Sequence, residues 1–498
     1  MYLLNSRQIK EWDQQTMVDR AITSAQLMEQ AGNALSRKIM ELFTDHNTPF
    51  IIICGTGNNG GDGMVIARVL RNNFYNVRVV EVNMGNTPSA DYKFMKSQLL
   101  ACGNVELSQW KKDTLSGLKK TTVVVDAILG SGTNREVSSL VAEAIDEINS
   151  SSLPIISIDL PSGMMIDLVA AENCVKADAT LTIQSLKLPF FIEENLDFVG
   201  TVYTVDIGLV NPFYADTPFE YLDQDWACRQ IPIRKKASHK GHYGHAAILA
   251  GSDGKVGAAI LATNACSRSG CGWTTIMSRE SIVQQVIQAV PEAMSLALPS
   301  NQFEGILQKF DAIGIGCGLG TRVVEKKLLQ ALITTKPCPL LIDADGLNIL
   351  AQDKDLLYKL PPNSVLTPHP GEFDRLFGKH GTSAERLTTQ LEKSKELKCF
   401  IVLKTSITSI STPEGKLYFN TSGNPGMAKA GSGDVLLGLM TGFVARYADL
   451  EIAVCLAVYI HGLAGDCAAS KFGQEAMKAG DLVDFLPTAF LNLIKKEG

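Results

Sequence analysis

The sequence lacks the cysteine patterns that hold structural metals or disulfide frameworks. Its 11 cysteines are scattered, with no Cys-x-x-Cys pair and no histidine at zinc-ligand spacing near the closest two, Cys266 and Cys271. An odd number of dispersed cysteines is typical of a reducing compartment, where most thiols act as small buried hydrophobes. The first residues, which include Lys10 and acidic side chains, do not form the apolar run of a signal peptide. We therefore expect a cytoplasmic protein.

A strong charge of one sign and a long apolar run are also missing. The formal net charge is −6 over 498 residues, and the densest basic cluster is 234–236 with Lys240 nearby. That cluster is too small for a nucleic-acid face. The apolar run 435–444 contains two glycines and is too short to span a bilayer. These features predict a soluble globular protein with no nucleic-acid partner and no membrane partner.

What the sequence does contain is a long alternation of strand and helix patterns. A chain of this length favours two domains. In the first half, Ser24 is expected to cap an amphipathic helix, and another helix begins near Asp62. Residues 210–238 show no clear period and are the predicted linker. The expected strands are 50–54, 77–82, 122–126, 155–159, 179–183 and 201–205, then 245–250, 273–277, 312–315, 340–343, 364–366 and 400–403.

The predicted strands are short continuous Ile and Val runs, which are typical of parallel sheets covered by helices on both faces. The chain is therefore predicted to be α/β, with two three-layer αβα domains. Two long helical patterns, 433–445 and 450–469, end the second half. We place the boundary so that the domains are 1–222 and 223–498.

Three polar loops follow predicted strands of the first half: "GTGNNGGDG" at 55–63, "DAILGSG" at 126–132 and "DLPSG" at 159–163. The first satisfies G-x-G-x-x-G, which by itself indicates an NAD-dependent dehydrogenase only weakly. Carboxyl ends of parallel strands meet at one edge of a sheet, so the three loops should converge on one crevice. Oxygens of Asn59, Asp126 and Ser162 are candidates to hold a cation there.

Together with "LMEQAG" at 27–32, these motifs resemble the NAD(P)H-hydrate epimerase domain, a Rossmann-like fold. The resemblance covers nearly all of residues 1–220. It implies a potassium ion held by Asn59, Asp126 and Ser162, and a catalytic role for Asp159 as proton acceptor. The implied contacts with the hydrated dinucleotide are Asn58, Asn59, Gly60, Gly61, Asp62, Gly130, Ser131, Gly132, Thr133, Asn134, Arg135, Glu136 and Asp159.

The stretch "AKAGSGDVLLGLM" at 428–440 carries the strongest chemical signal of the second half. Its glycines leave backbone N–H groups free for phosphate oxygens where a helix begins, and the helix dipole favours that negative charge. Asp434 then stands where it can accept the proton of an attacking hydroxyl, which is typically worth 10²–10⁴ in rate.

With "GIGCGLG", "IDADGLN", "LTPHPGEF" and "LKTSIT", this stretch resembles the ADP/ATP-dependent NAD(P)H-hydrate dehydratase family, which is ribokinase-like. The resemblance covers about residues 225–498. It implies Asp434 as catalytic base, magnesium, and ADP as co-substrate. Thr405 departs from the glycine usual in the family. The implied contacts are Ala258 or Ala259, Gly318, His369 and Asp434 for the hydrate, and Lys404, Thr405, Ser406, Ile407, Thr408 and Gly433 for the nucleotide.

Both resemblances together imply repair of hydrated NADH and NADPH, and we expect a homo-oligomer. The N-terminal domain would interconvert the R and S hydrates, and the C-terminal domain would dehydrate the S hydrate with ADP to give NAD(P)H, AMP and phosphate. Three alternatives stay open. The chain could be a dehydrogenase, a ribokinase-like small-molecule kinase fused to a dinucleotide-binding module, or a repair enzyme whose first half only binds.

Overall fold

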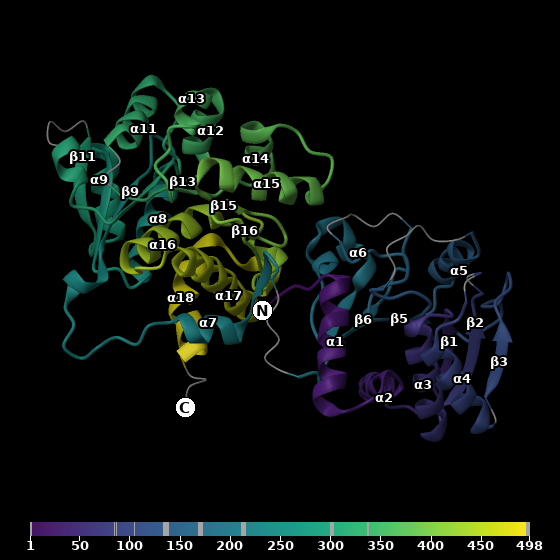
Figure 1. Ribbon diagram of the computed structural model, residues 1–498. Helices are drawn as coiled ribbons and strands as arrows, with labels where there is room; N and C mark the ends of the chain where they lie inside the picture. Colours follow the sequence, from purple (N-terminus) through teal and green to yellow (C-terminus); the bar gives the residue numbers. More distant parts are fainter. Residues whose placement is uncertain are drawn as a thin grey trace. The chain divides into compact units, whose positions relative to one another are not determined.

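The chain divides into two compact units in the computed structural model (Figure 1). The N-terminal unit comprises Tyr2–Thr217 with Thr382–Ala384, and the C-terminal unit comprises Pro218–Gly381 and the chain from Glu385 onward. The structure describes residues 2–83, 85, 87–103, 105–132, 139–167, 173–210, 216–298, 303–335 and 338–494.

The N-terminal unit is built on a seven-stranded sheet of order β3-β2-β1-β4-β5-β6-β7, in which every neighbouring pair is parallel. Its elements are α1 (Ser6–Arg20), α2 (Ser24–Leu42), β1 (Pro49–Cys54), α3 (Asn58–Asn72), β2 (Asn76–Glu81), α4 (Ala90–Ala101), β3 (Glu106–Gln109), β4 (Val123–Ala127), α5 (Ser139–Ser150), β5 (Ile155–Ile158), β6 (Ala179–Ile183), the 3-10 turns η1 (Leu188–Phe191) and η2 (Glu193–Asn195), α6 (Leu196–Val199) and β7 (Thr201–Val205).

Alternate side chains of β1 enter two different cores. Phe50 and Ile52 pack with residues of α1 to α4, whereas Ile51 and Ile53 pack with residues of α5. A strand directs successive side chains to opposite faces, so a continuous apolar run is what a sheet covered on both sides requires. This arrangement confirms the predicted three-layer αβα architecture of the first half.

The C-terminal unit is built on a ten-stranded sheet of order β11-β10-β9-β12-β13-β14-β15-β16-β17-β8. Its pairs are parallel except β15 with β16 and β16 with β17. Its elements are β8 (Phe219–Leu222), α7 (Gln224–Gln230), η3 (Lys240–Tyr243), β9 (His245–Leu249), α8 (Val256–Arg268), β10 (Trp273–Arg279), α9 (Glu280–Ala289), β11 (Met294–Leu298), α10 (Phe303–Leu307), β12 (Ala312–Ile315), α11 (Val323–Thr335), β13 (Leu340–Ile342), α12 (Ala344–Gln352), α13 (Lys354–Leu357), β14 (Val365–Leu366), α14 (Pro370–Phe377), α15 (Ser383–Leu397), β15 (Phe400–Leu403), β16 (Ser409–Ser411), β17 (Leu417–Asn420), η4 (Pro425–Met427), α16 (Ser432–Arg446), α17 (Leu450–Ala476) and α18 (Ala479–Ile494).

The segment predicted as a linker is partly regular structure. Within 210–238, β8 pairs in parallel with β17, and α7 follows after an Asp223 cap. Four residues are too few for a periodic signal, and the partner strand lies nearly 200 residues away in the sequence, so local pattern could not reveal β8. β3, β11, β16 and β17 were also not predicted, and each is only three to five residues long.

Two helix details also differ from expectation. Thr23, not Ser24, caps α2: its Oγ1 accepts from the N–H of Gln26 at 3.2 Å, and Gln26 Oε1 accepts from the N–H of Thr23 at 2.8 Å. Ser24 instead donates to Asp91 at 2.6 Å. α3 begins at Asn58, before the predicted Asp62.

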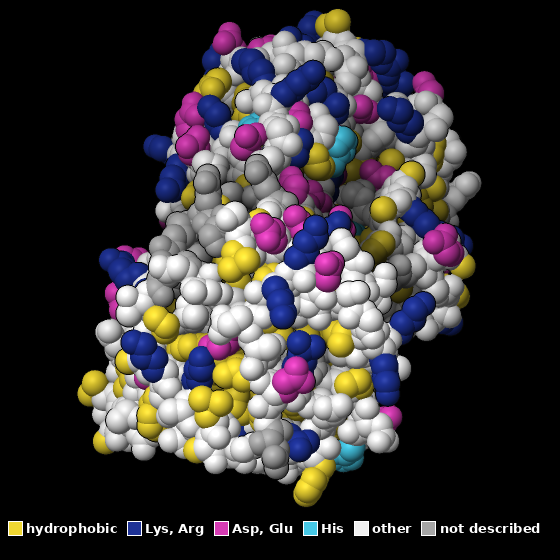
Figure 2. All heavy atoms as spheres, turned by 90° about the vertical axis from the view of Figure 1, so that its right-hand side faces the viewer, with side chains coloured by type: hydrophobic (Ala, Val, Ile, Leu, Met, Phe, Trp, Pro, Cys, Tyr) yellow, Lys and Arg dark blue, Asp and Glu magenta, His cyan; other side chains and the backbone are white. Residues whose placement is uncertain are grey.

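Among the described residues, one helix is apolar and long enough to cross a membrane. It is α17, rather than the 435–444 run, and 67% of its most apolar window is buried inside the protein. Its contacts with α16 and α18 make it a core helix. On the face in Figure 2, positive and negative side chains are interspersed, as a chain without a concentrated basic patch predicts.

Candidate active sites

The N-terminal unit contains a cavity of about 600 Å³ at the carboxyl edge of its sheet. Its wall includes the start of α3, the loop after β4, residues after β5 and β6, and parts of α1 and α2. The strand order reverses at β1 and β4, where ligands bind in open parallel sheets. Members of all three polar loops recognised in the sequence line this cavity.

Asp159 follows β5 and is paired with a buried lysine. Its Oδ1 lies 2.7 Å from Nζ of Lys187, and its Oδ2 accepts from the N–H of Ser131 at 3.0 Å. Lys187 is 1% exposed and also donates to Thr182 Oγ1 and the Ile183 carbonyl, both at 2.8 Å. Burial opposes ionisation of Asp159, but Lys187 and Ser131 outweigh it and hold the pKa of Asp159 below its usual value. The cavity therefore contains a carboxylate whose ionised form is favoured by its neighbours.

The backbone of Asp159 is strained. Its φ is 68°, in the left-handed region that non-glycine residues seldom adopt. Such conformations cost about 1–3 kcal/mol and cluster at functional sites. This strain gives a second reason, independent of charge, to place chemistry at Asp159.

The three residues predicted to hold potassium meet around one loop. Nδ2 of Asn59 donates to the Leu129 carbonyl at 2.8 Å, and the N–H of Leu129 donates to Oγ of Ser162 at 2.9 Å. Ser162 Oγ donates to Asp126 Oδ1 at 2.5 Å. Oδ1 of Asn59 is buried and has no hydrogen-bond partner among the described residues. Because a buried oxygen without a donor is suited to a cation, the residues present fit a potassium ion.

The glycines of the 55–63 stretch divide between packing and the cavity. A Cβ at Gly60 would lie 1.8 Å from the Gly55 carbonyl oxygen, and one at Gly61 would lie 2.5 Å from Met28 Sδ. Gly60 and Gly61 are thus required for close packing of α3, and neither lines the cavity. Gly57 does line it, and a Cβ there would meet nothing within 4 Å.

Most of the other predicted hydrate contacts line the cavity. These are Asn58, Asn59, Asp62, Gly130, Ser131, Gly132 and Asp159. Thr133, Asn134, Arg135 and Glu136 lie outside the described residues. No side chain among the described residues caps α3, so its first N–H groups are available to an anion in the cavity.

In the C-terminal unit, Asp434 lies in the first turn of α16, after Gly431 with φ 99°. Burial raises the pKa of Asp434 and Asp343 adds to the rise, while a hydrogen bond with the Cys317 side chain and the charge of Lys404 oppose it. Nζ of Lys404 lies 2.6 Å from Oδ1 of Asp343. The lysine therefore pairs with Asp343 and leaves Asp434 able to take up a proton.

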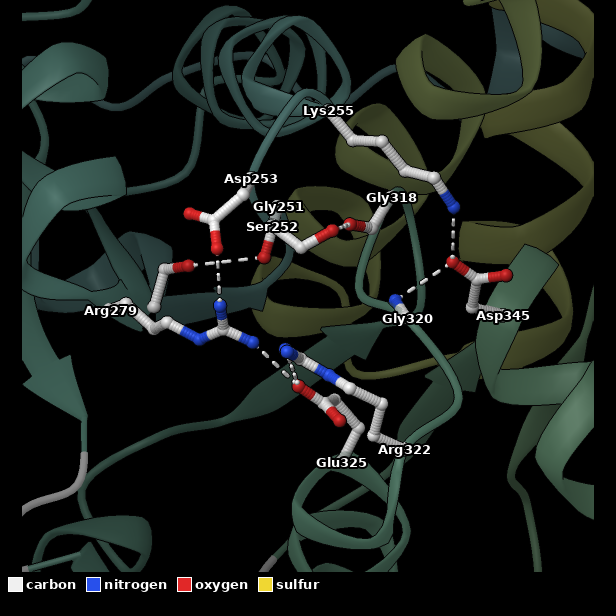
Figure 3. Close-up of polar contacts among 11 residues, drawn as sticks. Gly251, Ser252, Asp253, Lys255, Arg279, Gly318, Gly320, Arg322, Glu325 and Asp345 are labelled. Carbon is white, nitrogen blue, oxygen red and sulfur yellow. Dashed lines mark hydrogen bonds and ion pairs between the residues drawn. The ribbon is translucent and has the colours of Figure 1, made fainter.

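Gly318 lies against the start of α8. Its φ is 59°, and a Cβ there would lie 2.9 Å from Cβ of Lys255 and 3.1 Å from Cβ of Ala258. Ser252 Oγ donates to the Gly318 carbonyl at 2.6 Å (Figure 3), and Lys255 forms an ion pair with Asp345 at 3.1 Å. The structure thus brings together two predicted hydrate contacts, Ala258 and Gly318.

The loop that contains Gly318 is also held in place by contacts that follow Gly318 in the sequence. The N–H of Gly320 donates to Asp345 at 2.8 Å, and Arg279 and Arg322 both donate to the buried Glu325, at 2.9 and 2.7 Å (Figure 3). Charged side chains therefore hold the loop after β12 at Gly320 and at Arg322.

The remaining predicted hydrate contacts take other positions. Ala259 is fully buried in the core, so of the two alternatives Ala258 is the one beside Gly318. His369 is the N-cap of α14: its Nδ1 accepts from the N–H of Gly371 at 3.1 Å, and its side chain is about half exposed. His369 is therefore held by its own helix, and its other ring nitrogen, Nε2, lies 3.6 Å from Oε2 of Glu372.

The segment predicted to face the nucleotide, 404–408, joins β15 to β16. Oγ1 of Thr405 donates to the Ile407 carbonyl at 2.8 Å and accepts from the Ile407 N–H at 3.2 Å, which closes a turn containing Ser406. Nζ of Lys404 lies 3.3 Å from the position of a Cβ on Gly433. The structure thus places Lys404, the first residue of this segment, beside the start of α16.

Comparison with known proteins gives the same two halves. The family described as YjeF-related protein N-terminus matches residues 24–188, and the family described as NAD(P)H-hydrate dehydratase matches 246–488. The bifunctional NAD(P)H-hydrate repair enzyme of Moorella thermoacetica is 33% identical, over 99% of this chain and 97% of that protein. The Escherichia coli K12 enzyme of the same name is 30% identical, over 93% and 89%. The chain belongs to the bifunctional NAD(P)H-hydrate repair enzyme family.

A solved structure supports the fold of the second half of this family member. A ribokinase-like superfamily protein from Enterococcus faecalis V583 matches with a TM-score of 0.52 and 29% identity, covering 57% of this chain and 99% of that chain. Together with the family match, it confirms the ribokinase-like fold and the resemblance expected from the motifs.

Two charged residues of this family member's N-terminal cavity escaped the sequence analysis. Lys187 had a signal, since a lone lysine within "SLKLPFF" is buried only when paired. Asp13 on α1 had no such signal, because helix periodicity does not distinguish a residue that lines a cavity from one that faces solvent. Asp13 also lies before residue 24, where the match to the N-terminal family begins. Burial and the Asp159 charge raise the pKa of Asp13 to about 6, with Lys187 opposing. Burial, Asp159 and Asp13 also raise the pKa of Asp62.

Proposed function

We propose that this protein repairs hydrated NADH and NADPH. The N-terminal unit interconverts the R and S hydrates, and the C-terminal unit dehydrates the S hydrate with ADP, giving NAD(P)H, AMP and phosphate. The observation that carries the proposal is that each unit holds one aspartate suited to its step. Asp159 is ionised within the cavity, and Asp434 can take up a proton at a glycine-lined helix start. The activity named for the full-length relatives agrees with this division.

The dehydratase step follows from the surroundings of Asp434. Asp434 accepts the proton of the C6 hydroxyl as that oxygen attacks the terminal phosphorus of ADP and AMP leaves. The uncapped N–H groups of α16 and the nearby Lys404 receive the phosphate oxygens. Phosphate then leaves C6 with its bonding electrons, driven by the ring nitrogen lone pair, and loss of the C5 proton restores the dihydronicotinamide.

Magnesium would offset phosphate charge in this step. Oδ1 of Asp343 is occupied by Lys404, while its Oδ2 lies 3.5 Å from the position of a Cβ on Gly433, at the phosphate end of α16. Mg²⁺ typically takes one or two carboxylates with substrate phosphates and water. Asp343 therefore fits the role of the protein ligand, with the nucleotide phosphates completing the shell.

Potassium would serve the epimerase site. Burial raises the pKa of Asp126, and hydrogen bonds from Ser162 and Ser157 offset part of that rise. A monovalent cation beside the unpartnered Oδ1 of Asn59 would favour the ionised form of Asp126 and attract the dinucleotide phosphates. The protein's own contribution is to hold Asn59 and Ser162 against the Leu129 backbone.

The test is to give the full-length protein a mixture of R and S hydrates with ADP, with ATP or with neither. We expect near-ultraviolet absorbance of the dihydronicotinamide ring to recover only with nucleotide, and the R hydrate to be consumed after the S hydrate. Each hydrate is followed by chromatography against an enzyme-free blank. A stable phosphorylated product would favour the kinase alternative, and no change under any condition would overturn the proposal.

A further inference from the structure

Asp13 brings a further carboxyl group to the epimerase cavity, from a different element than Asp159 and Asp62. It lies on α1, which is held at the cavity by a hydrogen bond from Ser6 Oγ to the Ser131 carbonyl at 2.7 Å. The same Ser131 donates its N–H to Asp159. Asp13 lines the cavity and is only partly exposed, yet no donor among the described residues reaches its carboxyl oxygens. A carboxyl group in a ligand cavity that none of these described residues engages is available to the ligand.

The charges around Asp13 set it apart from Asp159. Asp159 after β5 and Asp62 on α3 are acidic neighbours, the charge of Lys187 opposes them, and Lys10 on α1 also lines the cavity. Lys187 is already bonded to Asp159, so it offsets only part of the repulsion on Asp13. The two carboxyl groups are thereby pushed toward opposite protonation states, the pattern that assigns an acid and a base in one site.

Epimerisation at C6 needs such a pair. The hydrate carbon bears the hydroxyl and the ring nitrogen, so the C–O bond breaks when an acid protonates the hydroxyl and the nitrogen lone pair forms the C=N bond. Water is released with the C–O electrons. A water then attacks the opposite face while a base takes its proton, which restores the hydrate with inverted configuration.

We propose that Asp13 is the general acid of epimerisation and that Asp159 is its base, an inference that rests on the proposed function. The proton of Asp13 goes to the departing hydroxyl oxygen, and the proton of the attacking water goes to Asp159. The reverse reaction uses the same groups with exchanged roles, and proton exchange with water resets the pair. No oxidant or further reactant is required.

The experiment compares Asp13→Asn with Asp19→Asn, the same change at an exposed position of α1. Both are made in the full-length protein, and clearance of the R hydrate is measured with ADP after the S hydrate is exhausted. We expect Asp13→Asn to slow R clearance at least 10²-fold while S-hydrate dehydration stays unchanged. Asp19→Asn should clear the R hydrate at the wild-type rate.

The pH profile separates an acid from a merely structural residue. Wild-type kcat/KM for R clearance should fall with a one-proton slope as Asp13 ionises, and Asp13→Asn should lack that limb. Asp13→Glu should keep the limb at a reduced rate, which preserves the test if Asp13→Asn unfolds. Unchanged R clearance in Asp13→Asn, or a persistent limb, overturns the inference. A wild-type protein that never clears the R hydrate would overturn the proposed function instead.

Discussion

In both units of the molecule a lysine that follows a strand forms an ion pair with an aspartate, but the pKa of the aspartate at the site shifts in opposite directions. In the N-terminal unit, Lys187 binds the aspartate at the centre of the site and keeps Asp159 ionised. In the C-terminal unit, Lys404 binds Asp343 instead, and Asp434 keeps a raised pKa. The pairing partner of the lysine therefore decides whether the pKa of the aspartate at the site is lowered, as for Asp159, or raised, as for Asp434.

The backbone around Asp159 also differs from that around Asp434. Asp159 sits directly at a strand end with a left-handed φ, fixed by Ser131 and Lys187. Asp434 is the third residue of α16, where a dipole and free N–H groups favour an anionic ligand. The site of Asp159 contains a negative charge before the ligand binds, whereas the site of Asp434 gains negative charge from the phosphates of its ligand.

The largest expected effect comes from removing the proton acceptor. Asp434→Asn should lower ADP-dependent dehydration of the S hydrate about 10²–10⁴-fold, while interconversion of R and S hydrates continues, because Asp434 belongs to the C-terminal unit alone. Asp159→Asn should do the reverse. Both rates are measured in one sample by chromatography of the hydrates.

The matched control is Asp484→Asn, an exposed aspartate on α18, which should leave both rates unchanged. If Asp434→Asn stopped epimerisation as well, the two sites would not be independent, and the comparison between them would be wrong.

Lys187→Met should produce the next largest effect, on stability. It leaves Asp159 buried without its cation, which typically costs about 3–5 kcal/mol. Hydrogen exchange read by mass spectrometry should show faster exchange in the N-terminal unit alone. The double variant Lys187→Met with Asp159→Asn should recover much of the loss, because the uncompensated charge is gone. An equal loss in single and double variants would show that packing, not charge, is what Lys187 supplies.

A feature of these sites could be predicted from the sequence when the residues that form it lie within one short segment of the chain. The loop that begins at Gly55 and the helix start at Asp434 were predicted because glycine spacing and the following helix pattern lie within one short segment. The pairing of Lys187 with Asp159 and the place of Asp13 were not, because each depends on segments far apart in the chain meeting at one cavity. The fold followed the same rule: continuous apolar strands were found, whereas β8 was missed because its partner is remote.

Gly57 and Gly60 allow a test, with smaller expected effects, of which glycines in the 55–63 loop are needed for packing and which for ligand binding. Gly60→Ala should destabilise the N-terminal unit by about 1–3 kcal/mol or more, because the new Cβ meets the Gly55 carbonyl oxygen. Gly57→Ala should change stability by less, because its Cβ meets no atom, but it should weaken hydrate binding by narrowing the cavity. Urea unfolding and the KM for R clearance measure the two effects. Equal stability losses would contradict this division of the loop.

The smallest expected effect is the pH dependence that Asp13 gives to folding. In the unfolded chain Asp13 ionises near pH 3.8, but in the folded unit it ionises near pH 6. Its contribution to stability is thus fully present below about pH 4 and is lost as the pH rises through 6. The loss amounts to about 1–2 kcal/mol after allowance for partial exposure. Asp159 has the opposite shift, so its contribution is lost only as the pH falls below its usual range.

Asp13→Asn should therefore raise the urea midpoint of the N-terminal unit at pH 7 and leave it nearly unchanged at pH 4. Asp19→Asn, exposed on the same helix, should follow the wild type at both pH values. If Asp13→Asn also followed the wild type, Asp13 would ionise normally and could not hold the proton that the inferred acid requires. A stabilised but slower variant would instead show that the unit gives up folding energy to keep an unpartnered acid beside Asp159.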